Sequence, residues 1–240
     1  MNILITGGAS GLGEAITRKL AKNKENTIYF TFSKSDENAR KLTSEFSNSN
    51  AIRCDFKKEE DLEKLFSSIP DFNLDVLVNN AYTGSFLMTY FHKIDLNDFK
   101  NEFLNDVIPT IRITQSVISE FRKRKSGKII TVLTSALLNT PPIGSSIYIA
   151  NKSCLEEMTK VWAVENGRFN ITSNSISPSM METGITQNID ERIIDQLKGI
   201  HPLKRFVSTD EVAESIEYLT IVSTHVNGVN IVINSAVNIS

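Results

Sequence analysis

The sequence predicts an α/β fold in which a seven-stranded parallel sheet is covered by helices on both faces. Two observations lead to this prediction. Short runs rich in Ile and Val alternate with longer amphipathic segments along the whole chain, and strands buried on both faces of a sheet have this composition. A cluster of glycines follows the first of these runs directly and precedes an amphipathic segment. Because right-handed crossovers place helices on both sides of such a sheet, the expected architecture is doubly wound.

The expected elements follow one another without a linker or a repeat. The last helix has the clearest beginning, since Ser208 or Thr209 can cap it and Asp210 and Glu211 occupy its first turn. The alternation continues to the C-terminus, so we expect a single domain over residues 1–240. Strands are predicted at 2–6, 27–32, 51–54, 74–79, 128–134, 170–176 and 229–233, and helices at 11–23, 37–47, 59–68, 97–124, 146–166, 187–198 and 209–222.

The composition excludes several classes of function. Lys and Arg number 26 and Asp and Glu 28, so the chain has no general attraction to nucleic acid or anionic lipid. Two cysteines cannot make a disulfide framework, and no window approaches the roughly 18 apolar residues that span a bilayer. No signal peptide is visible, and His92, His201 and His225 lack metal-ligand spacing. We therefore expect a cytoplasmic protein without a nucleic-acid partner, a membrane partner or a metal site.

The glycine cluster reads Thr6-Gly7-Gly8-Ala9-Ser10-Gly11-Leu12-Gly13 and stands between the first strand and the first helix. A bound pyrophosphate needs close backbone approach, free N–H groups and the positive end of a helix. Glycines remove the side chains where these conditions must be met. The context predicts a Rossmann-type dinucleotide site, formed by Gly7, Ser10, Gly11, Leu12 and Gly13.

The end of the second strand indicates which dinucleotide binds. An acidic residue about 20 positions beyond the glycines would bind the ribose 2′-hydroxyl of NAD. The residues at that distance include Ser33 and Lys34 but no acid, and Asp36 lies farther on, at a helix start. A carboxylate would repel a 2′-phosphate, whereas Ser33 and Lys34 can bind one. NADP(H) is therefore favoured over NAD(H).

A Tyr-x-x-x-Lys pair, Tyr148 and Lys152, lies on one face of a predicted helix, with Ser135 thirteen residues before the tyrosine. Reducing a ketone requires a hydride on carbon and a proton on oxygen. An ammonium ~4 Å from a phenolate contributes ~4 kcal/mol at an effective dielectric of ~20. We therefore expect Lys152 to lower the Tyr148 pKa by up to ~3 and make Tyr148 a general acid or base. Ser135, or Thr134 as a stand-in, would polarise the carbonyl oxygen.

These motifs resemble those of the short-chain dehydrogenase/reductase family, and the resemblance spans nearly the whole chain. Its supporting features are the Gly-x-x-x-Gly-x-Gly spacing, Asn79-Asn80-Ala81 after the fourth predicted strand, and the order Ser, Tyr, Lys. The resemblance implies that Asp55 binds the adenine amine, that Asn80 and Ala81 lie against the coenzyme, and that Lys152 also binds the nicotinamide ribose.

Further implications come with departures from the family pattern. Tyr82 stands where the family has glycine. Asp106, or Asn105 after a one-residue shift, takes the place of an asparagine that supports the catalytic lysine. Pro178 and Thr183 would cover the nicotinamide, and residues 183–200 would form a lid helix over the substrate.

The resemblance implies an NADPH-dependent oxidoreductase that acts on a ketone or secondary alcohol, nearest to 3-oxoacyl-(acyl-carrier-protein) reductases and also close to reductases of surface-polysaccharide precursors. The substrate would be a small-molecule or carrier-bound carbonyl compound. The alternative is a non-catalytic NADP(H)-binding sensor or scaffold. The predicted helices 97–124 and 146–166 resemble those that pair in family dimers, so a homodimer or homotetramer is expected.

Overall fold

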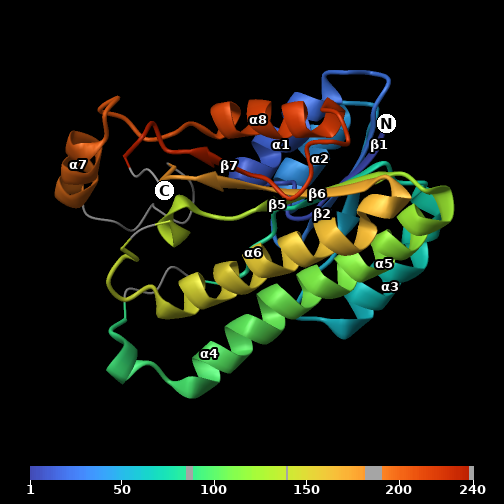
Figure 1. Cartoon of the computed structure of the whole chain (residues 1–240). Coiled ribbons are helices and arrows are strands. Elements are labelled where there is room, and N and C mark those ends of the chain that lie inside the picture. Colours follow the sequence, from blue (N-terminus) through green and yellow to red (C-terminus); the bar gives the residue numbers. More distant parts are fainter. Residues whose placement is uncertain (85–88, 139, 182–190, 238–240) are drawn as a thin grey trace.

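The computed structural model describes residues 1–84, 89–138, 140–181 and 191–237, and within these residues seven parallel strands form one sheet. The strand order is β3-β2-β1-β4-β5-β6-β7, which makes the fold doubly wound (Figure 1). The predicted fold class and the predicted parallel sheet are therefore confirmed. The strands are β1 Asn2–Ile5, β2 Thr27–Phe32, β3 Ser49–Arg53, β4 Val76–Asn79, β5 Gly127–Val132, β6 Ile171–Pro178 and β7 Asn230–Ile233.

Helices cover both faces of the sheet (Figure 1). Helices α1, α2 and α8 pack on one face, and α3, α5 and α6 pack on the other. None of the helices within the described residues is long and apolar enough to cross a membrane. The helices are α1 Gly11–Ala21, α2 Asp36–Glu45, α3 Glu59–Phe72, α4 Leu96–Glu102, α5 Ile108–Arg124, α6 Ser146–Asn166, α7 Glu191–Ile200 and α8 Thr209–Ile221.

Strand β1 shows how the sheet builds two cores from one short sequence. Successive side chains of a strand point to opposite faces. Ile3 and Ile5 accordingly join the apolar cluster under α1, α2 and α8, while Leu4 joins the cluster under α3, α5 and α6. All three side chains are fully buried. Full burial stabilises the fold by about 1.5–3 kcal/mol for each such side chain, which explains why β1 reads as an unbroken apolar run.

The neighbours of β1 determine where the functional site lies. The chain passes from β1 to β2 on one side and later returns to form β4 on the other side. The connections after β1 and β4 therefore leave in opposite directions, and a crevice opens at the carboxyl ends of these two strands. The glycine turn follows β1 and Asn80-Ala81 follows β4, so the topology brings both motifs to that crevice.

The helix predicted over 97–124 is not continuous. A π-helical segment, Phe103–Val107, separates α4 from α5, and the Ile108 N–H donates to the Phe103 carbonyl across this wider turn. Asp106 lies inside the π segment, a type of turn that is often found at functional sites. The predicted helix 187–198 corresponds to α7, which begins at Glu191; positions 182–190, including Thr183, lie outside the described residues.

Candidate active site

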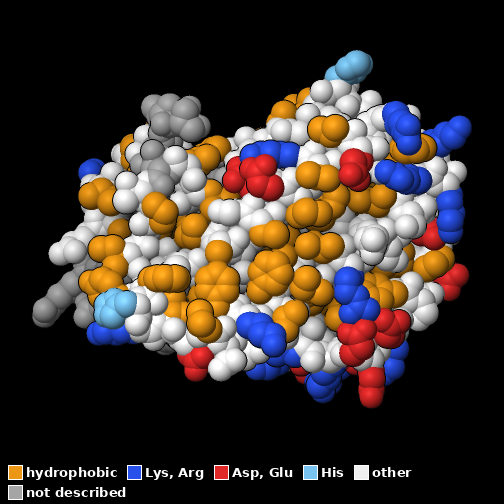
Figure 2. Space-filling model, turned by 60° about the horizontal axis from the view of Figure 1, so that its bottom comes forward, with side chains coloured by type: hydrophobic (Ala, Val, Ile, Leu, Met, Phe, Trp, Pro, Cys, Tyr) orange, Lys and Arg blue, Asp and Glu red, His pale blue; other side chains and the backbone are white. Residues whose placement is uncertain are grey.

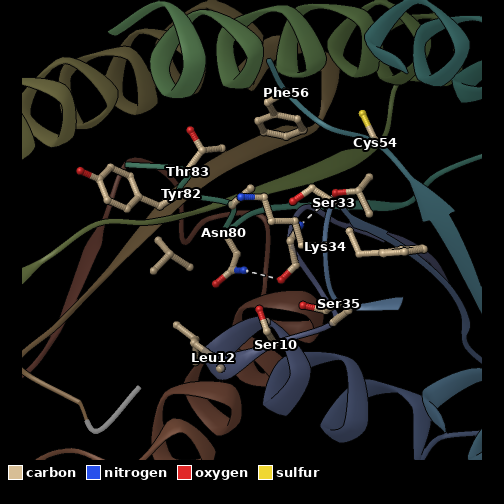
Figure 3. A pocket seen from close by; sticks show the side chains of 18 of the residues that line it. Ser10, Leu12, Ser33, Lys34, Ser35, Cys54, Phe56, Asn80, Tyr82 and Thr83 are labelled. Carbon is tan, nitrogen blue, oxygen red and sulfur yellow. Dashed lines mark hydrogen bonds between the residues drawn. The ribbon is translucent and has the colours of Figure 1, made fainter. Parts of the chain in front are cut away.

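A cavity of about 500 Å³ lies at the carboxyl ends of the strands. Figure 3 shows Asn80 near its middle, Ser10 and Leu12 on one side, and Tyr82 and Thr83 on another. The cavity collects residues that are far apart in the sequence but that the sequence analysis had assigned to one site. Its lining includes the predicted residues Gly7, Ser10, Gly11, Leu12, Gly13, Ser33, Lys34, Asp55, Asn80, Ala81, Tyr148 and Lys152.

The glycine turn has a backbone that only glycine adopts easily. Gly7 has φ +67° and Gly11 has φ +52°, both in the left-handed region. A Cβ atom on Gly13 would lie 2.0 Å from the Gly7 carbonyl oxygen, so the turn packs on α1 through backbone alone. In the described contacts of α1, the N-cap residue Ser10 makes no side-chain capping hydrogen bond. The N-terminus of α1 therefore offers backbone N–H groups and a positive dipole to an anion in the cavity.

Thr6 joins the two loops that form the centre of the cavity. Its Oγ1 accepts hydrogen bonds from the backbone N–H groups of Asn80 and Ala81, at 2.9 and 3.0 Å. The Asn80 side-chain amide in turn donates to the carbonyl oxygens of Thr6 and Gly7, at 2.9 and 3.2 Å. On the other side, the Gly7 N–H donates to Thr31 Oγ1 at 2.9 Å. These bonds fix the glycine turn between β2 and the end of β4.

The end of the cavity next to β2 carries a cation and two hydroxyl groups. Ser33, Lys34 and Ser35 line it, directly after the last residue of β2. Asp36 begins α2, and its Oδ1 lies 3.2 Å from Nη1 of Arg53 in an ion pair on the protein surface. Asp36, the first acidic residue after β2, is thus paired with Arg53 and is not among the residues that line the cavity, whereas Asp55 is.

Tyr148 and Lys152 lie one helical turn apart on α6, and both line the cavity. The Lys152 side chain is only 5% exposed, and its Nζ donates to the Val132 carbonyl oxygen at 2.9 Å. Burial lowers the pKa of Lys152 to about 8, because a low-dielectric environment disfavours the ammonium; the Asp106 carboxylate opposes this shift. The predicted pair is therefore present, and its lysine titrates near neutral pH.

The predicted low pKa of Tyr148 is wrong. Burial raises the pKa of the Tyr148 phenol above its ordinary value, and a hydrogen bond with the Thr134 side chain opposes this only in part. The attraction between a phenolate and an ammonium would lower the Tyr148 pKa, but the free-energy cost of burying the phenolate charge is larger and raises it. Tyr148 in this structure is a protonated phenol at neutral pH.

Thr134, the alternative to Ser135, contacts the tyrosine. The Thr134 side chain hydrogen-bonds Tyr148, and its Oγ1 also accepts the Ala136 N–H at 3.3 Å. Ser135 begins a 3₁₀ turn; Ser135 and Thr134 are both buried, and neither is among the residues that line the cavity. The hydroxyl that hydrogen-bonds the phenol is thus that of Thr134, which the sequence offered as a stand-in for Ser135.

Asp106 lies behind the cavity wall and is 3% exposed. Its Oδ1 accepts the backbone N–H of Thr83 at 2.5 Å, and burial raises its pKa while Thr83 and the nearby Lys152 charge oppose that shift. Asn105 instead lines a separate cavity of about 360 Å³ together with Glu102. Of the two candidates for the fourth position, the structure thus brings Asp106 toward Lys152.

Two predicted coenzyme contacts are not among the lining residues. Pro178 is buried at the end of β6, where it pairs with Ile233, and Thr183 lies outside the described residues. Thr6 and Thr31 were not predicted as site residues, although their positions at the ends of β1 and β2 were an available signal. Val132 was not predicted either, because it acts through its carbonyl group and leaves no side-chain signal.

Within the described residues, no group of three or more His, Cys, Asp or Glu side chains is arranged to hold a metal ion. Cys54 is buried, and burial with nearby acidic groups raises its pKa to about 12, so this thiol is a poor nucleophile. The groups available for chemistry are the phenol, the amine and the hydroxyl beside them.

The fold and the site together define the class of this protein as an oxidoreductase built on a dinucleotide-binding domain. A sequence model described as enoyl-(acyl carrier protein) reductase matches residues 7–237. The chain belongs to the short-chain dehydrogenase/reductase family. It is similar to 3-oxoacyl-(acyl-carrier-protein) reductase FabG of Aquifex aeolicus, with 30% identity over 240 residues that cover 94% of this chain and 95% of that protein.

Solved structures show the same fold. A variant of actinorhodin polyketide ketoreductase crystallised with NADPH superposes with a TM-score of 0.87 at 21% identity, covering 99% of this chain and 98% of that one. The 3-ketoacyl-(acyl-carrier-protein) reductase of Brucella melitensis, in complex with NADH, gives the same TM-score, identity and coverage. The predicted family, fold and enzyme class are therefore confirmed.

Proposed function

We propose that the protein reduces a ketone to a secondary alcohol with NADPH as the hydride donor. The observation that carries this proposal is the position of Tyr148 and Lys152, which lie together on α6 and line the same cavity as the glycine turn. Carbonyl reduction needs a proton donor beside the bound coenzyme, and these two side chains lie in the wall of the cavity that would hold it. A cytoplasmic location, expected from the sequence, belongs to the same proposal.

The cavity fits a nicotinamide dinucleotide. Gly7 and Gly11, with the N-terminus of α1, would hold its diphosphate, because they present backbone without side chains. Ser33 and Lys34 would bind a 2′-phosphate, and Asp55 lines the neighbouring wall. The bound coenzyme would supply the hydride. Of the two solved structures described above, one was crystallised with NADPH and the other with NADH. The preference of this protein for NADPH therefore rests on the side chains after β2.

Tyr148 would supply the proton. Its raised pKa keeps the phenol protonated at neutral pH, which suits a general acid that donates to a developing alkoxide. The Thr134 hydroxyl, which already hydrogen-bonds the phenol, would hold the carbonyl oxygen, in the role first expected of Ser135. The Lys152 ammonium would stabilise the phenolate left after proton transfer.

The substrate class we propose is a 3-oxoacyl thioester. The relative that is 30% identical bears the name of such a reductase. The cavity lining also includes Met181, a partly exposed apolar side chain that suits an acyl chain better than a sugar. A surface-polysaccharide precursor is the other substrate to test. A panel of ketones, acyl thioesters and keto-sugars, followed by the absorbance of reduced nicotinamide, would identify the preferred class.

A second candidate function is a non-catalytic NADP(H)-binding sensor or scaffold. Two side chains favour it: Tyr82 stands where the family has glycine, and Asp106 stands in place of an asparagine. The intact pair of Tyr148 and Lys152 favours the enzyme.

Substituting Tyr148 by Phe separates these two functions. We expect Tyr148→Phe to reduce ketone turnover by at least 10²-fold, because the proton donor is lost, while NADPH binding measured by calorimetry changes less than about threefold. Tyr218→Phe, on the outer surface of α8, is the matched control and should keep full activity. Unchanged turnover in Tyr148→Phe would refute the role of this phenol.

The pH dependence of ketone reduction should report Lys152. Its ammonium is present below a pKa of about 8 and is lost above it, so kcat/KM should be level below pH 8 and fall as the pH rises further. Asp106→Asn removes a charge that favours the ammonium, so the fall should begin at a lower pH. A profile that does not move in Asp106→Asn would assign the titration to another group.

Lys34 should set the preference between the two coenzymes. We expect NADPH to bind more tightly than NADH, and Lys34→Ala to weaken NADPH binding by about 3- to 10-fold without changing NADH binding, because one charge-assisted hydrogen bond is lost at a partly exposed site. Calorimetry measures both affinities. Lys41→Ala, on the exposed side of α2, provides the control. Equal affinities for NADPH and NADH in the unmodified protein would contradict the assignment.

We also infer a homodimer or homotetramer. Figure 2 looks at the molecule from the side of α4, α5 and α6 and shows apolar side chains spread over this face. The exposed apolar residues of the π segment and α6 include Leu104, Val161 and Val164, the last 84% exposed. Sedimentation velocity should give a dimer or larger species, and Val164→Glu should shift it toward the monomer. Ser44→Glu on α2 should leave the mass unchanged; a monomeric unmodified protein would refute the inference.

A further inference from the structure

Tyr82 occupies an unusual place beside the proposed acid. It follows β4 in the segment where the family resemblance calls for glycine, and its side chain lines the same cavity as Tyr148 and Lys152 (Figure 3). The rings of Tyr82 and Tyr148 are 5.3 Å apart between centroids and nearly perpendicular, at 81°. The Lys152 Nζ lies 5.5 Å from the centroid of the Tyr82 ring. One aromatic side chain thus contacts both members of the pair.

The position of this ring is fixed from the side of α4. The Tyr82 hydroxyl donates to Glu102 Oε2 at 3.2 Å, and the next residue, Thr83, donates its backbone N–H to Asp106. A Cβ atom on Gly84 would lie 2.5 Å from the Tyr82 hydroxyl oxygen and 2.7 Å from Glu102 Oε2. The glycine therefore leaves the space in which this hydrogen bond forms. The Tyr82 ring is therefore held in place by its hydrogen bond to Glu102, in space that Gly84 leaves free.

The contacts have a defined electrostatic effect. Edge-to-face packing places the positive edge of one ring against the negative face of the other, and it restricts the orientation of both rings. A cation within about 6 Å of an aromatic centroid is attracted to the ring quadrupole, more strongly when the cation is desolvated. Lys152 is 5% exposed, so its ammonium meets this condition.

We propose that Tyr82 is a positioning residue for the acid–base pair, which keeps Lys152 in its charged form through the aromatic ring and holds Tyr148 in orientation by packing against it. This inference deepens the proposed function and rests on it for the catalytic role of the pair. The Tyr82 ring would thereby offset part of the free-energy cost of burying the Lys152 ammonium.

Other charged groups near the pair must be separated from this effect. Asp106 in the π segment favours the Lys152 ammonium. Glu102 on α4 and Lys57, which follows β3, interact with Asp106 or Tyr82 and lie at the same wall. A substitution that removes the Tyr82 hydroxyl releases Glu102 as well as changing the ring. The test therefore compares two variants that both lack the hydroxyl.

The matched variants are Tyr82→Phe, which keeps the aromatic ring, and Tyr82→Leu, which keeps apolar bulk without it. The readout is the titration of Lys152, followed by NMR of protein carrying ¹³C at the lysine ε position, with Lys152→Met identifying the signal. In the unmodified protein this titration is expected at about 8. In Tyr82→Leu it should lie lower than in Tyr82→Phe by roughly half a pH unit or more, the size expected from loss of a desolvated cation–π contact.

Equal Lys152 titrations in the two variants would overturn the proposal. Should Tyr82→Leu fail to fold, fluorinated phenylalanine at position 82 keeps the ring shape while weakening its quadrupole, and the same downward shift relative to phenylalanine is expected. The NMR measurement needs neither coenzyme nor substrate. Absence of ketone turnover in the unmodified protein would therefore refute the proposed function, while only the NMR comparison decides the contribution of Tyr82.

Discussion

The ammonium of Lys152 is buried, and much of the site can be understood from the cost of burying it. Removing a cation from water costs several kcal/mol even after a protein relaxes around it. Three groups reduce that cost: the Val132 carbonyl at 2.9 Å, the Asp106 carboxylate, and the Tyr82 ring. The compensation is incomplete, and the lysine is left with a pKa of about 8. The ammonium of such a lysine is stabilised strongly by any negative charge that forms beside it. The phenolate of a tyrosine that has just donated its proton is such a charge.

The scaffold that supports this pair consists mainly of backbone groups. Parallel strands end at one edge of the sheet, and Thr6 connects the turn after β1 to the loop after β4 through hydrogen bonds to main-chain N–H groups. Lys152 likewise takes its partner from the backbone of β5. Because these contacts depend on strand order and register, they tolerate side-chain variation elsewhere.

The sequence allowed prediction of the features that depend on local geometry. Strand–helix alternation, the glycine spacing and the four-residue separation of Tyr148 and Lys152 are all fixed by neighbours in the chain. The features that were missed depend on contacts between distant segments. The direction of the Tyr148 pKa shift depends on how completely the Tyr148 side chain is buried, and the π segment interrupts a stretch that the sequence predicted as one helix. The sequence left Ser135 and Thr134 as alternatives, and the hydrogen bond between Thr134 and Tyr148 depends on how the segment after β5 packs against α6.

The π segment has a consequence for how α4 is oriented. A π turn accommodates one residue more than an α turn, so each residue before it is rotated by about 100° relative to an uninterrupted helix. Glu102, the last residue of α4, and Asp106, inside the π segment, bind Tyr82 and Thr83, which are neighbours in one loop. Residues four apart share a face of a helix, so both carboxylates reach this loop from one side, and the π segment changes the orientation of that side relative to α5. The loop after β4 and the length of this helix are thus geometrically matched, and a graft that carried only one of them into another scaffold would leave an acidic group buried without its donor.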